Sequence, residues 1–160
     1  MANEEYIKEE TRISWLASGG TYTLTADIAS GSGRQGGAGD FSSFPRSGWY
    51  RFMLVIDADT TPVLGELVRL FFKEGNNDGS SDVYTNDDGT TDAAVSAEDK
   101  LRNLRHLGTL EIDEAAAGVA MVITGRFYLD AQKGMPVIWN GTADDIDVFF
   151  YMWPIPPQGQ

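Results

Sequence analysis

Carboxylate and amide side chains that could bind a cation are concentrated in one segment. Residues 76–99 contain seven acidic side chains and neither lysine nor arginine. Oxygen ligands of this kind are preferred by Ca²⁺, but the EF-hand register fails, because placing Gly89 sixth puts Tyr84 first and Val95 last. The calcium candidates of another geometry are Asp78, Asp82, Asp87, Asp88 and Asp92. We interpret the segment as a long solvated acidic loop, with such a calcium site as the alternative.

Motifs for catalysis or cofactor binding are few. His106 is the single histidine, there is no cysteine, and no Gly-x-Ser-x-Gly sequence occurs. The Gly-x-Gly-x-x-Gly spacing of residues 31–36 is followed by Gly-Ala-Gly, where a dinucleotide-binding turn requires the start of a helix. We therefore predict no enzymatic activity and no cofactor, with a glycan hydrolase that uses paired carboxylates as an alternative. The glycine-rich residues 31–39 are expected to be a flexible connection or a contact arm.

Four tryptophans could stack on sugar rings. Most lie in segments where apolar residues alternate, so packing in the core or in an interface is the preferred interpretation, and carbohydrate binding remains an alternative. The four are Trp15, Trp49, Trp139 and Trp153.

The elements that would position these residues are predicted to be strands. Runs of β-branched and aromatic residues are separated by clusters of Gly, Asp, Asn and Ser, which favour turns. The clearest run, 145–152, places Ile146, Val148, Phe150 and Met152 on one face, as expected for a sheet with one buried face. The eight predicted strands are 11–16, 21–29, 48–58, 66–73, 104–112, 120–130, 136–141 and 145–152.

The predicted strand 48–58 carries apolar residues on both faces. One face has Tyr50 and Phe52, whereas the other has Trp49, Met53 and Val55. A lone sandwich cannot bury both faces of such a strand, so we expect another subunit to cover the second face.

Two shorter features complete the prediction. Residues 92–104 could hold one or two helical turns, with Ser96 as the N-cap. Asn140-Gly-Thr142 matches a glycosylation sequon, but we interpret Asn-Gly as a hairpin turn between the last two strands.

These elements fit one domain of 160 residues. We predict an all-β, antiparallel β-sandwich of jelly-roll type, with about eight strands and one long acidic loop. Residues 11–155 would form the sandwich, 1–10 an N-terminal arm and 156–160 a C-terminal tail.

Charge and hydropathy restrict the partners. A net charge of -12 repels phosphates, so nucleic-acid binding is not expected. The polar, acidic N-terminus differs from a signal peptide, and the longest apolar run, 148–157, is far below the ~20 residues that cross a bilayer. We therefore expect neither Sec export nor a membrane span.

Several motifs resemble a family of small virion proteins of tailed bacteriophages. Such proteins open with a Trp-containing strand, pass through a glycine-rich Arg-Gln-Gly turn and end in a strand followed by proline. The matching sequences here are Arg12-Ile-Ser-Trp-Leu-Ala-Ser-Gly-Gly-Thr-Tyr-Thr-Leu-Thr25, Ser30-Gly-Ser-Gly-Arg-Gln-Gly36, Tyr50-Arg51-Phe52, Leu107-Gly-Thr-Leu110 and Tyr151-Met-Trp-Pro154. The acidic middle segment and the short tail depart from the pattern.

The resemblance implies a capsid decoration (cement) protein, a jelly roll that trimerises on the capsid surface and binds the major capsid protein. It would be made in the host cytoplasm and reside in the virion. The alternative is a tail or head-fibre adhesin domain that binds host carbohydrate. The expected residues of contact with the capsid or a neighbouring subunit are Tyr6, Ile7, Arg34, Gln35, Trp49, Arg51 and Met53.

Overall fold

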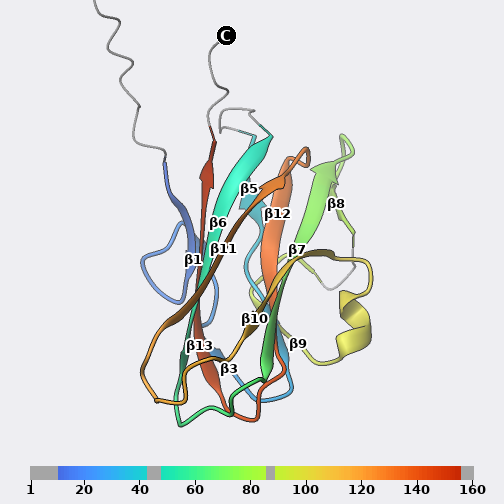
Figure 1. Ribbon diagram of the computed structural model, residues 1–160. Helices are drawn as coiled ribbons and strands as arrows, with labels where there is room; N and C mark the ends of the chain where they lie inside the picture. The colour runs from blue at the N-terminus through green and yellow to red at the C-terminus, as the bar shows by residue number, and fades with distance from the viewer. Residues whose placement is uncertain (1–10, 43–47, 86–88, 156–160) are drawn as a thin grey trace, which may run out of the picture.

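Two β-sheets pack face to face in the computed structural model, which describes residues 11–42, 48–85 and 89–155 (Figure 1). In spatial order, sheet A contains β11 (Met121–Tyr128), β6 (Trp49–Ala58), β13 (Ile146–Pro154), β1 (Ile13–Leu16) and β2 (Tyr22–Thr23), with β3 (Asp27–Ile28) also paired to β13. Sheet B contains β10 (Arg105–Glu111), β7 (Leu67–Asn77), β12 (Lys133–Asn140), β4 (Gly33–Gln35) and β9 (Ala93–Val95), with β5 (Gly39–Asp40) on β12 and β8 (Asp82–Tyr84) on β7.

The order of the main strands is that of a jelly roll. Eight strands, β1, β4, β6, β7, β10, β11, β12 and β13, can be numbered one to eight along the chain. Sheet A then reads 6-3-8-1 and sheet B reads 5-4-7-2, which are two interleaved Greek keys. The neighbours in both runs are antiparallel. The predicted all-β jelly-roll sandwich is confirmed.

The core lies between the sheets, as strand alternation predicts. Along β13, Ile146, Val148, Phe150 and Met152 are fully buried, whereas the residues between them are partly exposed. Strand β6 alternates in the same way, with Phe52, Leu54 and Ile56 buried. Burial of a large apolar side chain stabilises the fold by about 1.5–3 kcal/mol, so this alternation fixes which face of each strand points inward.

The outer faces of the two sheets differ. On sheet B, Phe71, Val137 and Trp139 are buried beneath Val95 of β9 and Leu101 of the 3₁₀ helix η1 (Glu98–Leu101). This second cluster explains why β12 is buried on both of its faces. The outer face of sheet A has no such cover among the described residues, and its side chains are partly or largely exposed.

The acidic segment 76–99 is not one solvated loop, contrary to the prediction. Strand β7 extends to Asn77, β8 pairs with it, and β9 pairs with β4. The acidic composition of the segment indicates exposed side chains, and most of them are exposed, but it does not show that the backbone pairs in strands. Val95, which is 3% exposed, packs the segment against sheet B.

The glycine-rich residues 31–39 are also not a flexible connection or an arm. They form β4 and β5, and β4 takes the jelly-roll place predicted for 21–29, which instead forms two-residue strands β2 and β3. Glycine is needed for close approach: a Cβ on Gly36 would lie 2.7 Å from Trp15 Cδ1, and one on Gly39 would lie 2.9 Å from Trp15 Cζ2.

Two local predictions were wrong. Residues 92–104 contain a single turn, η1, but its N-cap is Ala97 without a side-chain hydrogen bond, so Ser96 is not the cap. Asn140-Gly is no hairpin turn, because it leads from β12 in sheet B to β13 in sheet A. Asn140 is fully buried, and its Nδ2 donates to the carbonyl oxygens of Ile28 and Asp144. It is therefore a structural residue whose side chain is not accessible for glycosylation.

Candidate functional site

Three of the predicted contact residues, Trp49, Arg51 and Met53, lie together on the outer side of sheet A. We call this surface the sheet A face. Its other members come from the neighbouring strands and were not all singled out by the sequence prediction. The face comprises Trp49, Arg51, Met53, Val55 and Asp57 of β6, Val122, Thr124, Arg126 and Tyr128 of β11, and Asp147, Phe149, Tyr151 and Trp153 of β13.

The strand register arranges these residues in rows. Val55 pairs with Val122 and Phe149, which makes an apolar middle row. The next rows toward one end are Met53 with Thr124 and Tyr151, and then Arg51 with Arg126 and Trp153. At the opposite end Asp57 pairs with Asp147. The sheet A face therefore has an arginine and aromatic end, an apolar middle and an aspartate end.

Aromatic rings and guanidinium groups contact one another at the first end. The Tyr151 and Trp153 rings are stacked with centroids 6.2 Å apart and planes at 29°. The guanidinium carbon of Arg12 lies 5.2 Å from the Tyr151 ring centroid, and that of Arg51 lies 5.9 Å from the Trp153 centroid. Trp49, 51% exposed, meets Tyr128 edge to face. Trp, Tyr and Arg are the residue types enriched in binding hot spots.

Like charges adjoin at the aspartate end. Asp147 pairs directly with Asp57 on one side and with Asp27 of β3 on the other. Burial raises the pKa of Asp147, and the charges of Asp59, Asp27 and Asp57 raise it further. In the described part of the chain, no lysine or arginine forms an ion pair with Asp27, Asp57 or Asp147. The bare carboxylates repel one another, which disfavours the folded state.

Asp147→Asn is therefore expected to raise the free energy of unfolding at neutral pH by about 0.5 kcal/mol. A raised folded-state pKa means that repulsion costs stability above that pKa and is relieved as pH falls through it. The advantage of Asn should accordingly disappear in acid. Urea denaturation across a pH series measures it, with the exposed Asp113→Asn as the control. Equal stability of Asp147→Asn and the wild type at neutral pH would contradict the repulsion.

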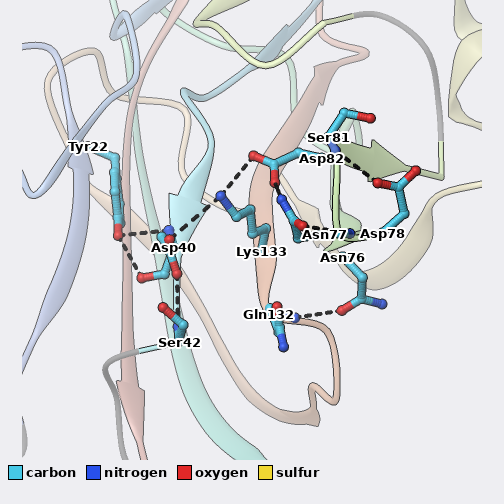
Figure 2. Close-up of polar contacts among 11 residues, drawn as sticks. Tyr22, Asp40, Ser42, Asn76, Asn77, Asp78, Ser81, Asp82, Gln132 and Lys133 are labelled. Carbon is cyan, nitrogen blue, oxygen red and sulfur yellow. Dashed lines mark hydrogen bonds and ion pairs between the residues drawn. The ribbon is translucent and has the colours of Figure 1, made fainter.

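A second polar cluster lies at the end of sheet B, where Lys133 joins β5 and β8 (Figure 2). Lys133 Nζ lies 2.7 Å from Asp82 Oδ2 and 3.6 Å from Asp40 Oδ2. Hydrogen bonds from Lys133 and Asn77 lower the pKa of Asp82. Asp78 Oδ1 accepts from the backbone N–H groups of Ser80 and Ser81, and these bonds lower its pKa. The carboxylates of Asp78 and Asp82 therefore accept hydrogen bonds from donors of the same chain.

Arg34 and Asp92, 58 residues apart, form a partly buried ion pair. Arg34 Nε donates to Asp92 Oδ1 at 2.6 Å and Nη2 to Oδ2 at 2.9 Å, while the backbone N–H of Thr25 donates to Oδ2 at 3.0 Å. Burial raises the pKa of Asp92, but the hydrogen bonds from Arg34 and Thr25 and the Arg34 charge outweigh it, so the net shift is downward. The neighbouring Gln35 is 2% exposed and donates to the Thr91 carbonyl, so it lies in the interior.

The predicted calcium ligands are thus engaged in separate places. Asp78 and Asp82 belong to the sheet B cluster, whereas Asp92 binds Arg34. Within residues 11–42, 48–85 and 89–155, no three His, Cys, Asp or Glu side chains are arranged to hold a metal ion. The remaining predicted site residues, Asp87, Asp88, Tyr6 and Ile7, lie outside the described residues.

Comparison with known proteins identifies neither a family nor a function for the chain. No family model and no curated protein matches the chain. The solved CBM22-1–GH10 modules of Clostridium thermocellum endo-1,4-beta-D-xylanase 10B, complexed with xylohexaose, align with 93% of this chain and 27% of that chain, at 9% identity and a TM-score of 0.41. VP2 of infectious bursal disease virus in T=1 particles aligns with 93% of this chain and 39% of its own, at 11% identity and a TM-score of 0.15.

The chain covers well under half the length of either solved structure. At these scores neither likeness supports a functional argument, and the fold class rests on the topology of the sheets. Among the described helices, none has the length and apolar character needed to cross a membrane.

Proposed function

We propose that this chain is a bacteriophage virion structural protein, a capsid decoration (cement) protein that binds between major capsid protein subunits and associates with copies of itself. The observation that carries the proposal is the sheet A face. It joins partly or largely exposed aromatic, aliphatic and arginine side chains on β6, on β13 and on the edge strand β11 of the jelly roll. Exposed contiguous apolar surface of this kind marks protein–protein contacts, and the motifs that resemble phage virion proteins supply the class of partner.

Binding to the capsid is divided, in this proposal, between the folded domain and residues 1–10. That segment carries four glutamates, one lysine and isolated apolar residues, among them Tyr6 and Ile7. Such a composition offers few side chains for a core, and we assign the segment to contact with the capsid.

Deletion of residues 1–10 is expected to leave the β-type circular dichroism spectrum unchanged and to reduce co-sedimentation with phage heads assembled without this protein. The full chain should bind these heads saturably. The proposed attachment would be contradicted if the full chain did not bind the heads. It would also be contradicted if the deletion variant bound them as well as the full chain does. Loss of the β spectrum would instead show that the segment is part of the fold.

The stacked Tyr151 and Trp153 rings favour a second candidate, a tail or head-fibre adhesin domain that binds host carbohydrate. Aromatic platforms bind sugars by stacking. Here Arg12 and Arg51 already lie over these two rings, which competes with a sugar for the same ring faces. Glycan-array binding that Trp153→Ala abolishes, without binding to heads, would favour the adhesin over the cement protein.

A further inference from the structure

Two arginines and two aspartates on the sheet A face and its edge, Arg51 with Asp57 and Arg12 with Asp27, lie symmetrically about its centre. We propose that two copies of the chain pack these faces together with their strands antiparallel. The inference deepens the proposed function, since it rests on self-association and names the surface that mediates it. The two-fold axis would run across the strands, parallel to the sheets, at the row centred on Leu54 of β6. Leu54 pairs with Ile123 of β11 on one side and with Phe150 of β13 on the other.

Strand β6 supplies the first complementary pair. Arg51 comes three residues before Leu54 and Asp57 comes three residues after it, and both point outward because Phe52, Leu54 and Ile56 point inward. At about 3.3 Å per residue, each charge lies roughly 10 Å from the central row. Reversal of the strand direction in the second copy therefore places Arg51 over the second copy's Asp57, and the symmetry repeats this contact.

The edge of β13 away from β6 supplies the second pair. Strands β1 and β3 both pair with that edge, so they follow one another along it. Arg12 precedes Ile13, whose partner is Met152, and thus lies level with Trp153. Asp27 is paired with Asp147. Because residues 153 and 147 are equidistant from Phe150, the same two-fold axis places Arg12 over the second copy's Asp27.

The middle of the face is complementary as well. Met53 would meet the second copy's Val55, and Phe149 would meet its Tyr151, so apolar side chains lie against apolar side chains. The opposite orientation, with parallel strands, would place arginines on arginines and aspartates on aspartates. Like-charge juxtaposition costs several kcal/mol in an interface, so charge fixes the antiparallel orientation.

An isologous contact of this kind joins copies in pairs, in contrast to the trimer that the family resemblance implies. It also brings cations to Asp27 and Asp57, the two neighbours of Asp147, and the repulsion among these three carboxylates is uncompensated by ion pairs within the described residues of one copy.

Charge reversal tests the pairing, because in an isologous contact a single reversal creates like-charge contacts whereas a double reversal restores opposite charges. We expect light scattering after size exclusion to give twice the 17.5 kDa chain mass for the wild type at micromolar concentration. Arg51→Asp and Asp57→Arg should each raise the dimer dissociation constant by about 100-fold or more, because each creates two like-charge contacts. An equimolar mixture of the two variants should dimerise again, and the double variant should dimerise alone.

Arg102→Asp, an exposed substitution beside η1 and away from the sheet A face, is the control and should leave the mass unchanged. Recovery of the dimer in the mixture shows that both single variants are folded. A monomeric or trimeric wild type, or a dimer that neither reversal weakens, would overturn the pairing. The proposed function is tested by a different measurement. If it is wrong, the protein will not co-sediment with phage heads, whether the free protein is a monomer or a dimer.

Discussion

Trp15→Ala is expected to lower the free energy of unfolding by about 4 kcal/mol. Trp15 has no exposed surface and its ring packs against those of Tyr22, Phe41 and Phe150. Its Nε1 also donates to the carbonyl oxygen of Gly37 at 2.8 Å. The variant would lose this hydrogen bond and leave a large cavity between the sheets.

Urea denaturation followed by circular dichroism measures the loss. Trp49→Ala is the matched control when both variants are measured at a concentration low enough for the chain to be monomeric. It removes the same side chain from a position that is 51% exposed, and it should cost less than about 1 kcal/mol. Similar losses for the two variants would show that Trp15 is not the centre of the core. Because Gly36 and Gly39 lie against Trp15, the truncation should also loosen β4 and β5, which faster amide exchange there would detect.

Asp92→Ala is expected to lower the free energy of unfolding by about 3 kcal/mol, because it leaves the Arg34 guanidinium without its bidentate carboxylate. The pair fastens residues 89–92 to β4 and to Thr25. Asp113→Ala removes the same charge from an exposed position and should have an effect within about 0.5 kcal/mol. A double-mutant cycle with Arg34→Met isolates the coupling between the two side chains.

The pH dependence provides an independent check on Asp92. Its folded-state pKa is lowered, so the carboxylate stabilises the protein above its unfolded pKa of about 3.9, and that stability is lost as pH falls through the folded value. The difference between wild type and Asp92→Asn should thus be full at neutral pH and vanish in strong acid. If millimolar calcium raised the melting temperature of the wild type but not of Asp92→Asn, the residue would be a metal ligand and the ion-pair role would be wrong.

The fold was largely predictable because the alternation of apolar and polar residues along a strand indicates directly which side chains are buried. Ile146, Val148, Phe150 and Met152 alternate with polar or amphipathic residues, and the strand lies where that pattern places it. Segments whose place depends on distant partners were not predictable. The strands of residues 31–39 exist because Trp15 and β12 lie against them, and glycine composition alone indicates only that the chain can turn.

The surface was predictable in part. Trp49, Arg51 and Met53 share a face by strand alternation, so their joint exposure followed from the sequence. Their alignment with Tyr151 and Trp153 of β13 depends on the register between strands almost 100 residues apart, which no local pattern specifies. For the same reason no local pattern predicts the Arg34–Asp92 pair, and the acidic composition of residues 76–99 favours a calcium site at Asp92 instead.

The position of β13 has a consequence for biosynthesis. This strand, the last in the described chain, lies in the middle of sheet A between β1 and β6. A ribosome-bound chain that ends before Ile146 therefore cannot join β1 to β6, and it presents two unpaired strand edges that other chains could bind. Assembly of sheet A must wait until β13 has been synthesised, and such long-range pairing folds in milliseconds to seconds rather than microseconds. Chains truncated within β13 should accordingly accumulate as aggregates, whereas chains that contain all of β13 should fold.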